Sequence, residues 1–511
     1  MKLDKENIDQ IKIGLEIHCQ LTNLNTKLFC RCLCNYRNLQ PNENTCPICL
    51  GLPGTLPLLN KRAVEFASMI CLAFNCSIPE KISFYRKNYF YPDLPKNFQI
   101  TQYNSYELSS IGYDGLYNFA HYLTGESSDS SIQNPKAFIR ITRIQLEEDP
   151  GKIAYEDEKS SINTYSLIDY NRAGVALVEI VTEPDFSNPS DVRIFLNEII
   201  NIFEYLEVCD PALEGSIRCD VNVSVKGGKK VEIKNISSFK DVEKSIYYEI
   251  TRQKTLLMHD IEVQAETRHW DERRKITVAA RSKEEEEEYK YFPEPDIPRI
   301  NLGGEKFVSN VRSQMHELPA ERLERYKDTY KITSHTARIL VNSKRISDFF
   351  EESLKFYQSP IEVSNWIINE LLTKINELEK TDNSKTSADI LSDSHMSPRL
   401  IASMAKLVEE KTVSRSMARE IFDTCLRTGE DPIELVKRLD TNRISNAEQI
   451  ADLIKKIVSD QPHLVDQSKS NPNVSNFILG LIMKETKGKA DPQVAMNSIR
   501  EILLSKSDRE S

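Results

Sequence analysis

The amino-acid sequence predicts an α+β fold in three parts: a mixed-sheet cradle domain with a zinc knuckle at residues 1–300, an all-α helical domain at 301–404 and a small helical tail domain at 405–511. Three observations predict this division. Strictly alternating apolar segments occur in the first part, helical spacing replaces them later, and a polar linker begins at Thr381. A chain of 511 residues is also too long for a single hydrophobic core.

The first predicted strand covers Ile11 to Leu21, where apolar side chains occupy every odd position. Successive side chains of a strand point to opposite faces of its sheet, so this pattern is typical of a half-buried strand. The other face of the strand then carries Glu16, His18 and Gln20.

Two helices are predicted in the same domain. Lys61 to Phe74 has an apolar stripe at helical spacing, and Asn60 before it is a suitable N-cap residue. Asp191 to Leu206 repeats this pattern directly after a helix-start signal at residues 188–190, which read Asn-Pro-Ser.

A hairpin is predicted between the alternating segments Ile217–Val225 and Val231–Lys234. We choose a three-residue loop, Gly227-Gly228-Lys229, because it pairs Ser224 with Glu232 and keeps one face wholly polar. A two-residue loop would mix the two faces. On an ordinary antiparallel sheet such a face simply meets water. Its residues are Arg218, Asp220, Asn222, Glu232 and Lys234.

Helices dominate the rest of the chain. Glu317 to Lys380 is predicted to form consecutive helices, and Thr381 to Ser387 a polar linker. Short helices follow, with a final helix through Leu504. The charged run Glu284 to Glu288 is interpreted as the solvated face of a helix.

A cysteine quartet near the start has the spacing of a zinc site. Its two pairs are Cys30-Arg31-Cys32 and Cys46-Pro47-Ile48-Cys49, separated by thirteen residues. Each short pair can turn two thiolates toward one ion, and four thiolates leave Zn²⁺ no open position, so the zinc would be structural. Free thiols and a disulfide framework are the alternatives, and Cys34 is a competing ligand.

Charge and composition indicate a cytoplasmic protein without a membrane segment. The net charge of −10 gives no general attraction to nucleic acid, so RNA contacts would have to come from local patches. No apolar run approaches the ~20 residues that span a bilayer. The start of the chain has neither an apolar signal core nor the composition of a transit peptide, which makes an organelle matrix the less favoured location. Scattered cysteines suggest a reducing compartment.

Three carboxylates and an imidazole are candidate Mg²⁺ ligands, because this ion favours oxygen ligands and keeps several waters. Glu16 and His18 share one face of the first strand, and Glu147 lies on a strand where Glu148 points to the opposite side. Glu232 comes from the polar hairpin face. Taken singly, each is a common surface residue. The sequence lacks the usual Gly-rich phosphate loops, so any ATP chemistry must use a different kind of site.

Several segments resemble the B subunit family of bacterial-type aspartyl/glutamyl-tRNA amidotransferases. The resemblance covers residues 11–505. The matching segments are Ile13–Leu21, Asn44–Gly54, Arg86–Lys96, Leu146–Lys152, Asp169–Val175, Glu232–Phe239, Tyr289–Asp296 and Met483–Pro492.

The resemblance implies one member of a heterotrimer, in which an amidase subunit releases ammonia from glutamine and a small strap subunit holds the other two together. This family converts Glu-tRNA(Gln) to Gln-tRNA(Gln), and often Asp-tRNA(Asn) to Asn-tRNA(Asn). Members of the family bind the mischarged tRNA and use ATP and Mg²⁺ to phosphorylate the side-chain carboxylate. The implied activity is a ligase that forms a carbon–nitrogen bond with glutamine as amido donor.

The resemblance also implies roles for individual positions. The implied catalytic residues and Mg²⁺ ligands are Glu16, His18, Glu147 and Glu232. The implied zinc ligands are Cys30, Cys32, Cys46 and Cys49. Lys87 and Lys96 match lysines near the ammonia route. The tail is expected to contact tRNA through Lys484, Lys487 and Lys489.

Three features depart from the family pattern. Gln145 stands where the family usually has His, the hairpin loop is shorter than usual, and Leu481-Ile482 replaces a polar segment. Two other functions are weighed. An archaeal-type homologue specific for Glu-tRNA(Gln) would carry a large inserted domain that is not evident here. A catalytically inactive tRNA-binding scaffold would have no need for the four Mg²⁺ ligands.

Overall fold

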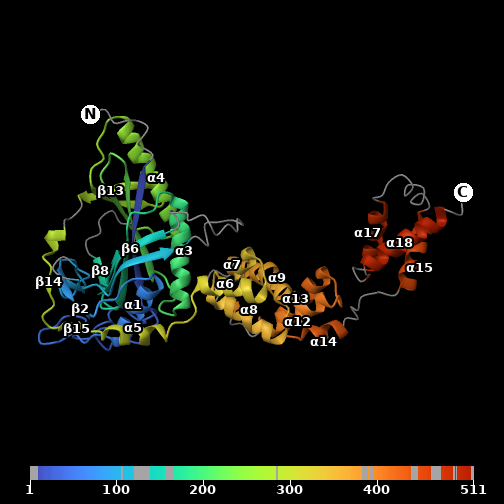
Figure 1. The fold of residues 1–511 in the computed structure, drawn as a ribbon, viewed down its shortest axis with the longest axis horizontal. Coiled ribbons are helices and arrows are strands. Elements are labelled where there is room, and N and C mark those ends of the chain that lie inside the picture. The colour runs from blue at the N-terminus through green and yellow to red at the C-terminus, as the bar shows by residue number, and fades with distance from the viewer. Residues whose placement is uncertain are drawn as a thin grey trace. The chain divides into compact units, whose positions relative to one another are not determined.

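The computed structural model describes residues 10–511 except 105–107, 120–137, 156–165, 283–285, 382–389, 392–394, 439–446, 462–473, 487–489, 491 and 508–511. The chain divides into two compact units, and the division falls between Arg322 and Leu323. Figure 1 shows the strands in the first unit and the helices of the second. Among the described residues, no helix combines the length and apolar character that crossing a bilayer requires.

The first unit is built around an eight-stranded sheet with the order β13-β12-β11-β10-β1-β9-β6-β5. Every neighbouring pair is antiparallel except β11 and β12, which are parallel and joined through helix α4. The strands are β1 (Ile11–Gln20), β5 (Gly112–Asn118), β6 (Phe138–Glu148), β9 (Ala176–Thr182), β10 (Ile217–Val225), β11 (Val231–Lys234), β12 (Glu266–Asp271) and β13 (Ile276–Ser282).

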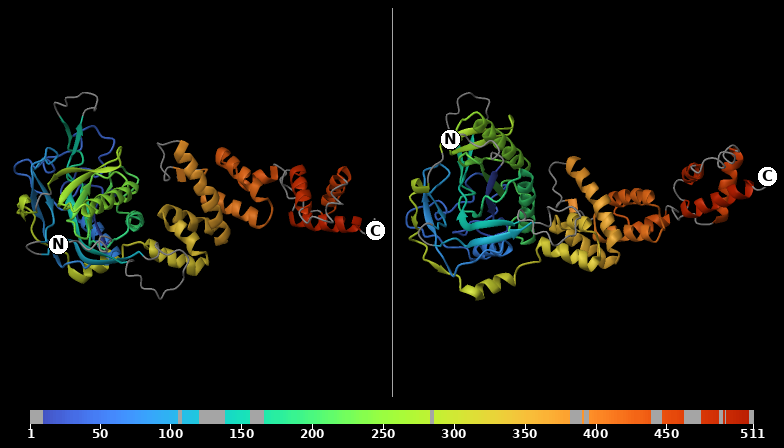
Figure 2. Two further views of the ribbon diagram at one scale, coloured as in Figure 1. Left: turned by 90° about the horizontal axis from the view of Figure 1, so that it is seen from above. Right: turned by 45° about the horizontal axis from the view of Figure 1, so that its top comes forward.

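One face of this sheet is covered by helices, and its side chains form the hydrophobic core of the unit. The odd-numbered residues of β1, such as Leu15, are buried in this core, as the alternation predicted. The helices are α1 (Lys61–Ala73), α3 (Pro189–Tyr205) and α4 (Phe239–Met258), and Figure 2 shows the unit in two further views. The Asn60 side chain caps α1 as predicted, and Asn188 caps α3 by accepting from the Ser190 N–H.

The hairpin of β10 and β11 has a register two residues from the predicted one. Asn222, rather than Ser224, lies opposite Glu232, although a shift of two leaves the same side chains on the polar face. Helix α4 causes the shift, because the Val225 N–H donates to Gln253 Oε1 at 3.1 Å and is therefore not available to β11. The loop is accordingly longer than the three residues predicted.

Smaller elements complete the first unit. The short sheets contain β14 (Phe292–Pro293), β3 (Tyr85–Asn88) and β4 (Phe98–Thr101); β15 (Ile300–Asn301) and β2 (Lys81–Ile82); and β7 (Lys152–Tyr155) and β8 (Ser166–Asp169). Within the charged run, Glu286–Tyr289 forms a short 3₁₀ helix, and the residues before it lie outside the described part. Helix α5 covers Gly304–Arg312.

The second unit is helical, as the sequence predicted beyond residue 317. Its helices are α6 (Pro319–Tyr330), α7 (Ser334–Val341), α8 (Lys344–Phe356), α9 (Pro360–Trp366), a π-helical turn (Ile367–Leu371), α10 (Leu372–Thr381), α12 (Pro398–Glu409), α13 (Arg415–Thr428), α14 (Pro432–Arg438), α15 (Ala447–Asp460), α17 (Val474–Glu485) and α18 (Pro492–Ser507). Most of the predicted polar linker lies outside the described residues.

The described part of the helical region contains two hydrophobic cores. One contains residues from Leu323 to Val436, and the other contains residues of α15, α17 and α18 from Ile450 to Ile499. The predicted boundary after residue 404 falls inside α12, where Met404 and Ala405 both belong to the first of these cores. The core is therefore continuous across that position, and the change of core comes after Val436.

Candidate active site

The central strands place polar side chains side by side on the sheet face that the helices leave uncovered, here called the polar face. Strand β1 lies between β10 and β9. In this register Glu16 is opposite Asp220, and His18 is opposite both Arg218 and Glu179. Since the side chains of directly opposed residues lie on the same side of a sheet, three strands contribute to one cluster.

A compact group of two carboxylates and one imidazole forms the centre of the polar face. The ligand atoms of Glu16, His18 and Glu179 all lie within 4.8 Å of one another. His18 Nε2 is 3.6 Å from Glu16 Oε1 and 3.5 Å from Glu179 Oε2. This Glu-His-Glu group has the ligand types and spacing of a divalent cation site.

Glu179 is the member of this group that the sequence reasoning missed. It is the one charged residue in the apolar strand β9, and it is only 9% exposed. A carboxylate in a buried strand is costly unless it is paired with a cation or a hydrogen-bond donor. That isolated charge in an otherwise apolar run is the signal that could have identified Glu179.

The other two predicted Mg²⁺ ligands flank the Glu-His-Glu group without joining it. Glu147 is buried and accepts a hydrogen bond from Thr101 Oγ1 at 2.8 Å. Glu232 accepts one from Thr267 Oγ1 at 3.0 Å, and its other oxygen lies 3.5 Å from Lys234 Nζ. The structure therefore brings Glu16 and His18 together and holds Glu147 and Glu232 beside them.

Carboxylates lie close together on the polar face, and both burial and their mutual repulsion raise pKa values there. Burial and the neighbouring Glu179 raise the pKa of Glu147 to about 7. Burial disfavours the imidazolium of His18, but the hydrogen bond to Glu179 and the charge of Glu16 outweigh burial and raise its pKa to about 9. Burial and Glu179 also raise the pKa of Glu16. A divalent cation would relieve this repulsion.

Lys87 and Lys96 line two different cavities. Lys87 lies at a cavity of about 420 Å³ that Lys234 and His269 also line, and its Nζ is 4.8 Å from the centre of the Tyr289 ring. Lys96 lies at a cavity of about 220 Å³. Its Nζ is 2.6 Å from the carboxylate of Glu148.

Glu148 and Gln145 have separate structural roles. Glu148 is buried and ion-paired with Lys96, and it also accepts a hydrogen bond from the Ile100 N–H at 2.9 Å. Gln145, the residue in place of the usual His, donates to the Gln102 carbonyl at 2.6 Å and accepts from Arg143 Nε at 3.1 Å. Both ends of this amide are thus engaged within the chain.

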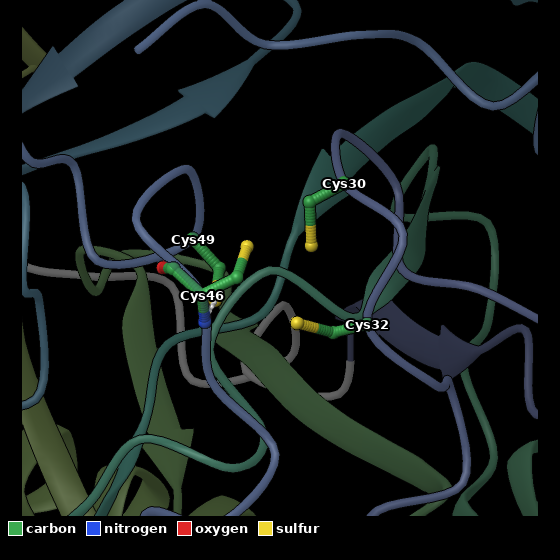
Figure 3. Close-up of side chains that lie close together, drawn as sticks. All are labelled: Cys30, Cys32, Cys46 and Cys49. Carbon is green, nitrogen blue, oxygen red and sulfur yellow. Dashed lines mark hydrogen bonds between the residues drawn. The ribbon is translucent and has the colours of Figure 1, made fainter. Parts of the chain in front are cut away.

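The four predicted zinc ligands form a single group, here called the knuckle: Cys30, Cys32, Cys46 and Cys49. Their sulfur atoms lie within 4.8 Å of one another, and Figure 3 shows the side chains converging. The competing Cys34 is outside the knuckle, because its Sγ donates to the Leu21 carbonyl at 3.4 Å. All eleven cysteines are free, which excludes the predicted alternative of a disulfide framework in this structure.

The surroundings of Cys49 in the knuckle favour its thiolate form. Lys27 is buried, with its Nζ 3.9 Å from Cys49 Sγ and 2.9 Å from the Asn44 carbonyl. The Cys46 N–H donates to Cys49 Sγ at 3.1 Å. A hydrogen bond from Cys30, with Lys27 nearby, lowers the pKa of Cys49 to about 5 in spite of burial. The hydrogen bond to Cys49 raises the pKa of Cys30, and burial raises the pKa of Cys32 to about 11, so these two thiols would lose their protons on binding the ion. Four thiolates then suit Zn²⁺ as a closed, structural site.

Of the predicted tRNA-binding lysines, Lys484 lies in the last turn of α17. Lys487 and Lys489 lie outside the described residues. Their role in binding tRNA stays a prediction.

Together, the fold and the site define an α+β domain that presents an acidic, cation-accepting face beside a four-cysteine knuckle. Two family profiles match this chain: the GatB/GatE catalytic domain at residues 11–308 and the GatB domain at residues 348–503. The chain belongs to this GatB family.

Similar proteins are named as the B subunit of an aspartyl/glutamyl-tRNA(Asn/Gln) amidotransferase. The protein of that name from Saccharolobus solfataricus is 39% identical over 493 residues, which is 96% of this chain and 99% of the relative. Those from Pseudothermotoga lettingae and Thermotoga maritima are 40% and 38% identical over 499 residues, covering 96% of this chain and 98% of each relative.

Proposed function

We propose that this chain is the B subunit of a glutamine-hydrolysing, tRNA-dependent amidotransferase, and that it uses ATP to phosphorylate the side-chain carboxylate of Glu-tRNA(Gln). Asp-tRNA(Asn) is a second substrate of the same chemistry. The family membership and the named relatives support the overall activity. The Glu-His-Glu group on the polar face is the observation that carries the phosphorylation step.

The chemistry requires activation because a carboxylate oxygen is a poor leaving group. In the first step the substrate carboxylate forms a bond to the γ-phosphorus of ATP as the bond to ADP breaks. In the second step ammonia attacks the acyl carbon, and phosphate leaves with its electron pair. An amide and inorganic phosphate are the products.

Mg²⁺ bound at this site would neutralise charge on the transferred phosphoryl group. Glu16, His18 and Glu179 would hold it, and Glu147, on β6 next to β9, and Glu232, on β11 beyond β10, are proposed to complete the ligand set. Neutralising these carboxylates with a cation also removes the repulsion that raises the pKa of Glu147. The residues therefore fit the ion that the reaction needs.

The remaining parts of the proposal concern partners and location. Ammonia comes from a separate amidase subunit, with a small strap subunit completing a heterotrimer in the cytoplasm. Lys87 and Lys96 lie along the route of ammonia, and the cavity at Lys87 lies at the polar face.

The helical tail, from about residue 405, contacts tRNA through local positive charge that includes Lys484. The knuckle holds one structural zinc ion.

Reconstitution with an amidase and a strap subunit tests this function directly. The complex should form ADP only when both ATP and Glu-tRNA(Gln) are present, and should convert the latter to Gln-tRNA(Gln) with glutamine as donor. Parallel assays with Asp-tRNA(Asn) define the substrate range. If the complex bound Glu-tRNA(Gln) but formed no ADP, the chain would be a scaffold rather than the phosphorylating subunit.

A further inference from the structure

Arg218 is a cation on the polar face that the metal site does not use. It lies on β10 directly opposite His18, and its side chain is 41% exposed. Among the residues that the structure describes, its one hydrogen-bond partner is Asp149, which accepts from Nη2 at 2.8 Å. A guanidinium has five N–H donors, so most of those of Arg218 are left for solvent or a ligand.

Asp149 fixes the position of Arg218 and is itself held firmly. This carboxylate is 1% exposed and accepts from Gln20 Nε2 at 2.6 Å, while Arg172 Nε lies 3.7 Å away. These contacts hold the buried carboxylate in place, so that it can orient Arg218.

Two guanidinium groups share this single carboxylate, so the cluster carries one surplus positive charge. Arg172 also serves the backbone, because it donates to the carbonyls of Pro150 at 2.9 Å and Gly151 at 2.6 Å. The surplus charge is consequently presented by Arg218, the more exposed of the two.

Other cations of the polar face are already paired with its acidic residues. Lys234 Nζ lies 3.1 Å from Asp220 and 3.5 Å from Glu232, and Arg143 lies 3.7 Å from Glu179. Arg218 differs because its partner Asp149 lies outside that acidic set. Arg218 can therefore bind an anion that enters beside the metal ligands. Its planar guanidinium can donate two parallel hydrogen bonds to phosphate oxygens.

We propose that Arg218 is a catalytic residue that donates hydrogen bonds to the γ-phosphoryl oxygens of ATP during transfer, and that Asp149 is the positioning residue that aims it. The inference rests on the function proposed above. As the substrate carboxylate bonds to the γ-phosphorus and ADP leaves, Arg218 stabilises the charge on the phosphoryl oxygens. It exchanges no proton, because its pKa is too high.

Replacing Arg218→Ala in the assembled complex tests this role with two readouts. Calorimetry with Mg²⁺ should show about 10- to 100-fold weaker binding of a non-hydrolysable ATP analogue, with ADP binding changed by less than about 2-fold. ATP cleavage driven by Glu-tRNA(Gln) should fall about 10²- to 10³-fold. Equal losses for ADP and the ATP analogue, or no loss, would overturn the role at the γ-phosphate.

Arg140→Ala is a matched control, since Arg140 also forms a close ion pair with an aspartate, Asp185, at 2.6 Å. It should leave nucleotide binding and ATP cleavage unchanged. Comparable losses in this variant would show that the effects of Arg218→Ala come from general destabilisation, and would count against the proposal.

The double variant Arg218→Ala/Asp149→Asn separates catalysis from simple charge neutralisation. It removes the buried charge of Asp149 together with the charge of Arg218, so it should fold even if Arg218→Ala does not. If Arg218 served only to neutralise Asp149, the double variant would recover analogue binding and ATP cleavage. We expect both losses to persist.

The wild-type complex distinguishes failure of this inference from failure of the proposed function. A wild-type complex without tRNA-dependent ATP cleavage would refute the function itself. Normal wild-type cleavage together with normal cleavage by Arg218→Ala would refute the role of Arg218 alone.

Discussion

The knuckle and the polar face are both groups of side chains that could hold a metal ion, but they are assembled over very different distances along the chain. The knuckle draws all four ligands from one segment, Cys30 to Cys49. The Glu-His-Glu group joins β1 to β9, and its flanking carboxylates come from β6 and β11. One site depends on local loop geometry, and the other depends on the register of the whole sheet. Substitutions at the two sites should therefore have different effects on the protein.

The largest expected effect is on the polar face. Glu16→Ala should lower ATP-dependent phosphorylation of Glu-tRNA(Gln) by about 10³-fold or more, because a metal ligand to the phosphoryl group contributes several kcal/mol. Glutamine hydrolysis by the amidase subunit should change by only about a few-fold. The measurements are ADP formation and ammonia release in the same complex.

Added ammonium and a control variant sharpen this experiment. Ammonium bypasses the amidase, so it should not rescue Glu16→Ala, and restored amide formation would show that Glu16 does not serve phosphorylation. Glu262→Ala removes a carboxylate whose side chain is 62% exposed and should have no effect.

Damage to the knuckle should instead appear as lost zinc and lost stability. Cys46→Ser should reduce bound zinc from about one equivalent to near zero and lower the melting temperature by roughly 5–10 °C. Cys34→Ser is the matched control, since its sulfur lies outside the knuckle and should leave the zinc content unchanged. Zinc loss in Cys34→Ser with retention in Cys46→Ser would reverse the assignment.

A smaller effect is expected at Glu179, the ligand that sequence reasoning missed. Glu179→Gln keeps the size of the side chain but removes its charge, and should weaken binding of Mn²⁺, as a probe for Mg²⁺, about 10- to 100-fold. Calorimetry of the complex without nucleotide measures this affinity. Glu183→Gln, just beyond β9, is the control, because Glu183 accepts from Thr142 at 2.8 Å and is not part of the group. Equal affinities in both variants would remove Glu179 from the site.

The smallest effect concerns the tail, where neither ligand set is involved. Lys484→Ala should weaken tRNA binding a few-fold and reduce the slope of log affinity against log salt by about one, if Lys484 contacts one phosphate. Titrations at several salt concentrations measure this slope. Lys61→Ala, whose side chain is 87% exposed in the first unit, should leave it unchanged. An unaltered slope in Lys484→Ala would mean that this lysine only covers the end of its helix.

Sequence patterns correctly predicted the features that depend only on nearby residues in the chain. Alternation identified β1, and Asn60 marked the start of α1 as its cap. The spacing of the four cysteines indicated the knuckle, which the structure brings together. In each case the information lies within about twenty residues.

The features that the sequence did not predict depend on packing between distant segments of the chain. The register of β10 and β11 depends on Gln253 of α4, which takes the Val225 N–H. Glu179 became part of the site only through the pairing of β9 with β1. The continuous core on both sides of residue 404 depends on helices that meet from distant segments. Local periodicity carries no information on any of these contacts.

The central position of β1 has a consequence for how the protein is made. This strand leaves the ribosome before its two partners in the sheet, which begin only at Ala176 and Ile217. Pairings between such distant segments form slowly. An apolar strand that stays unpaired until its partners have been synthesised is prone to aggregate. Glu16 and His18 meet Glu179 only once β1 is inserted. A nascent or misfolded chain therefore cannot hold this group together, and cation binding at the polar face would report that the sheet has formed.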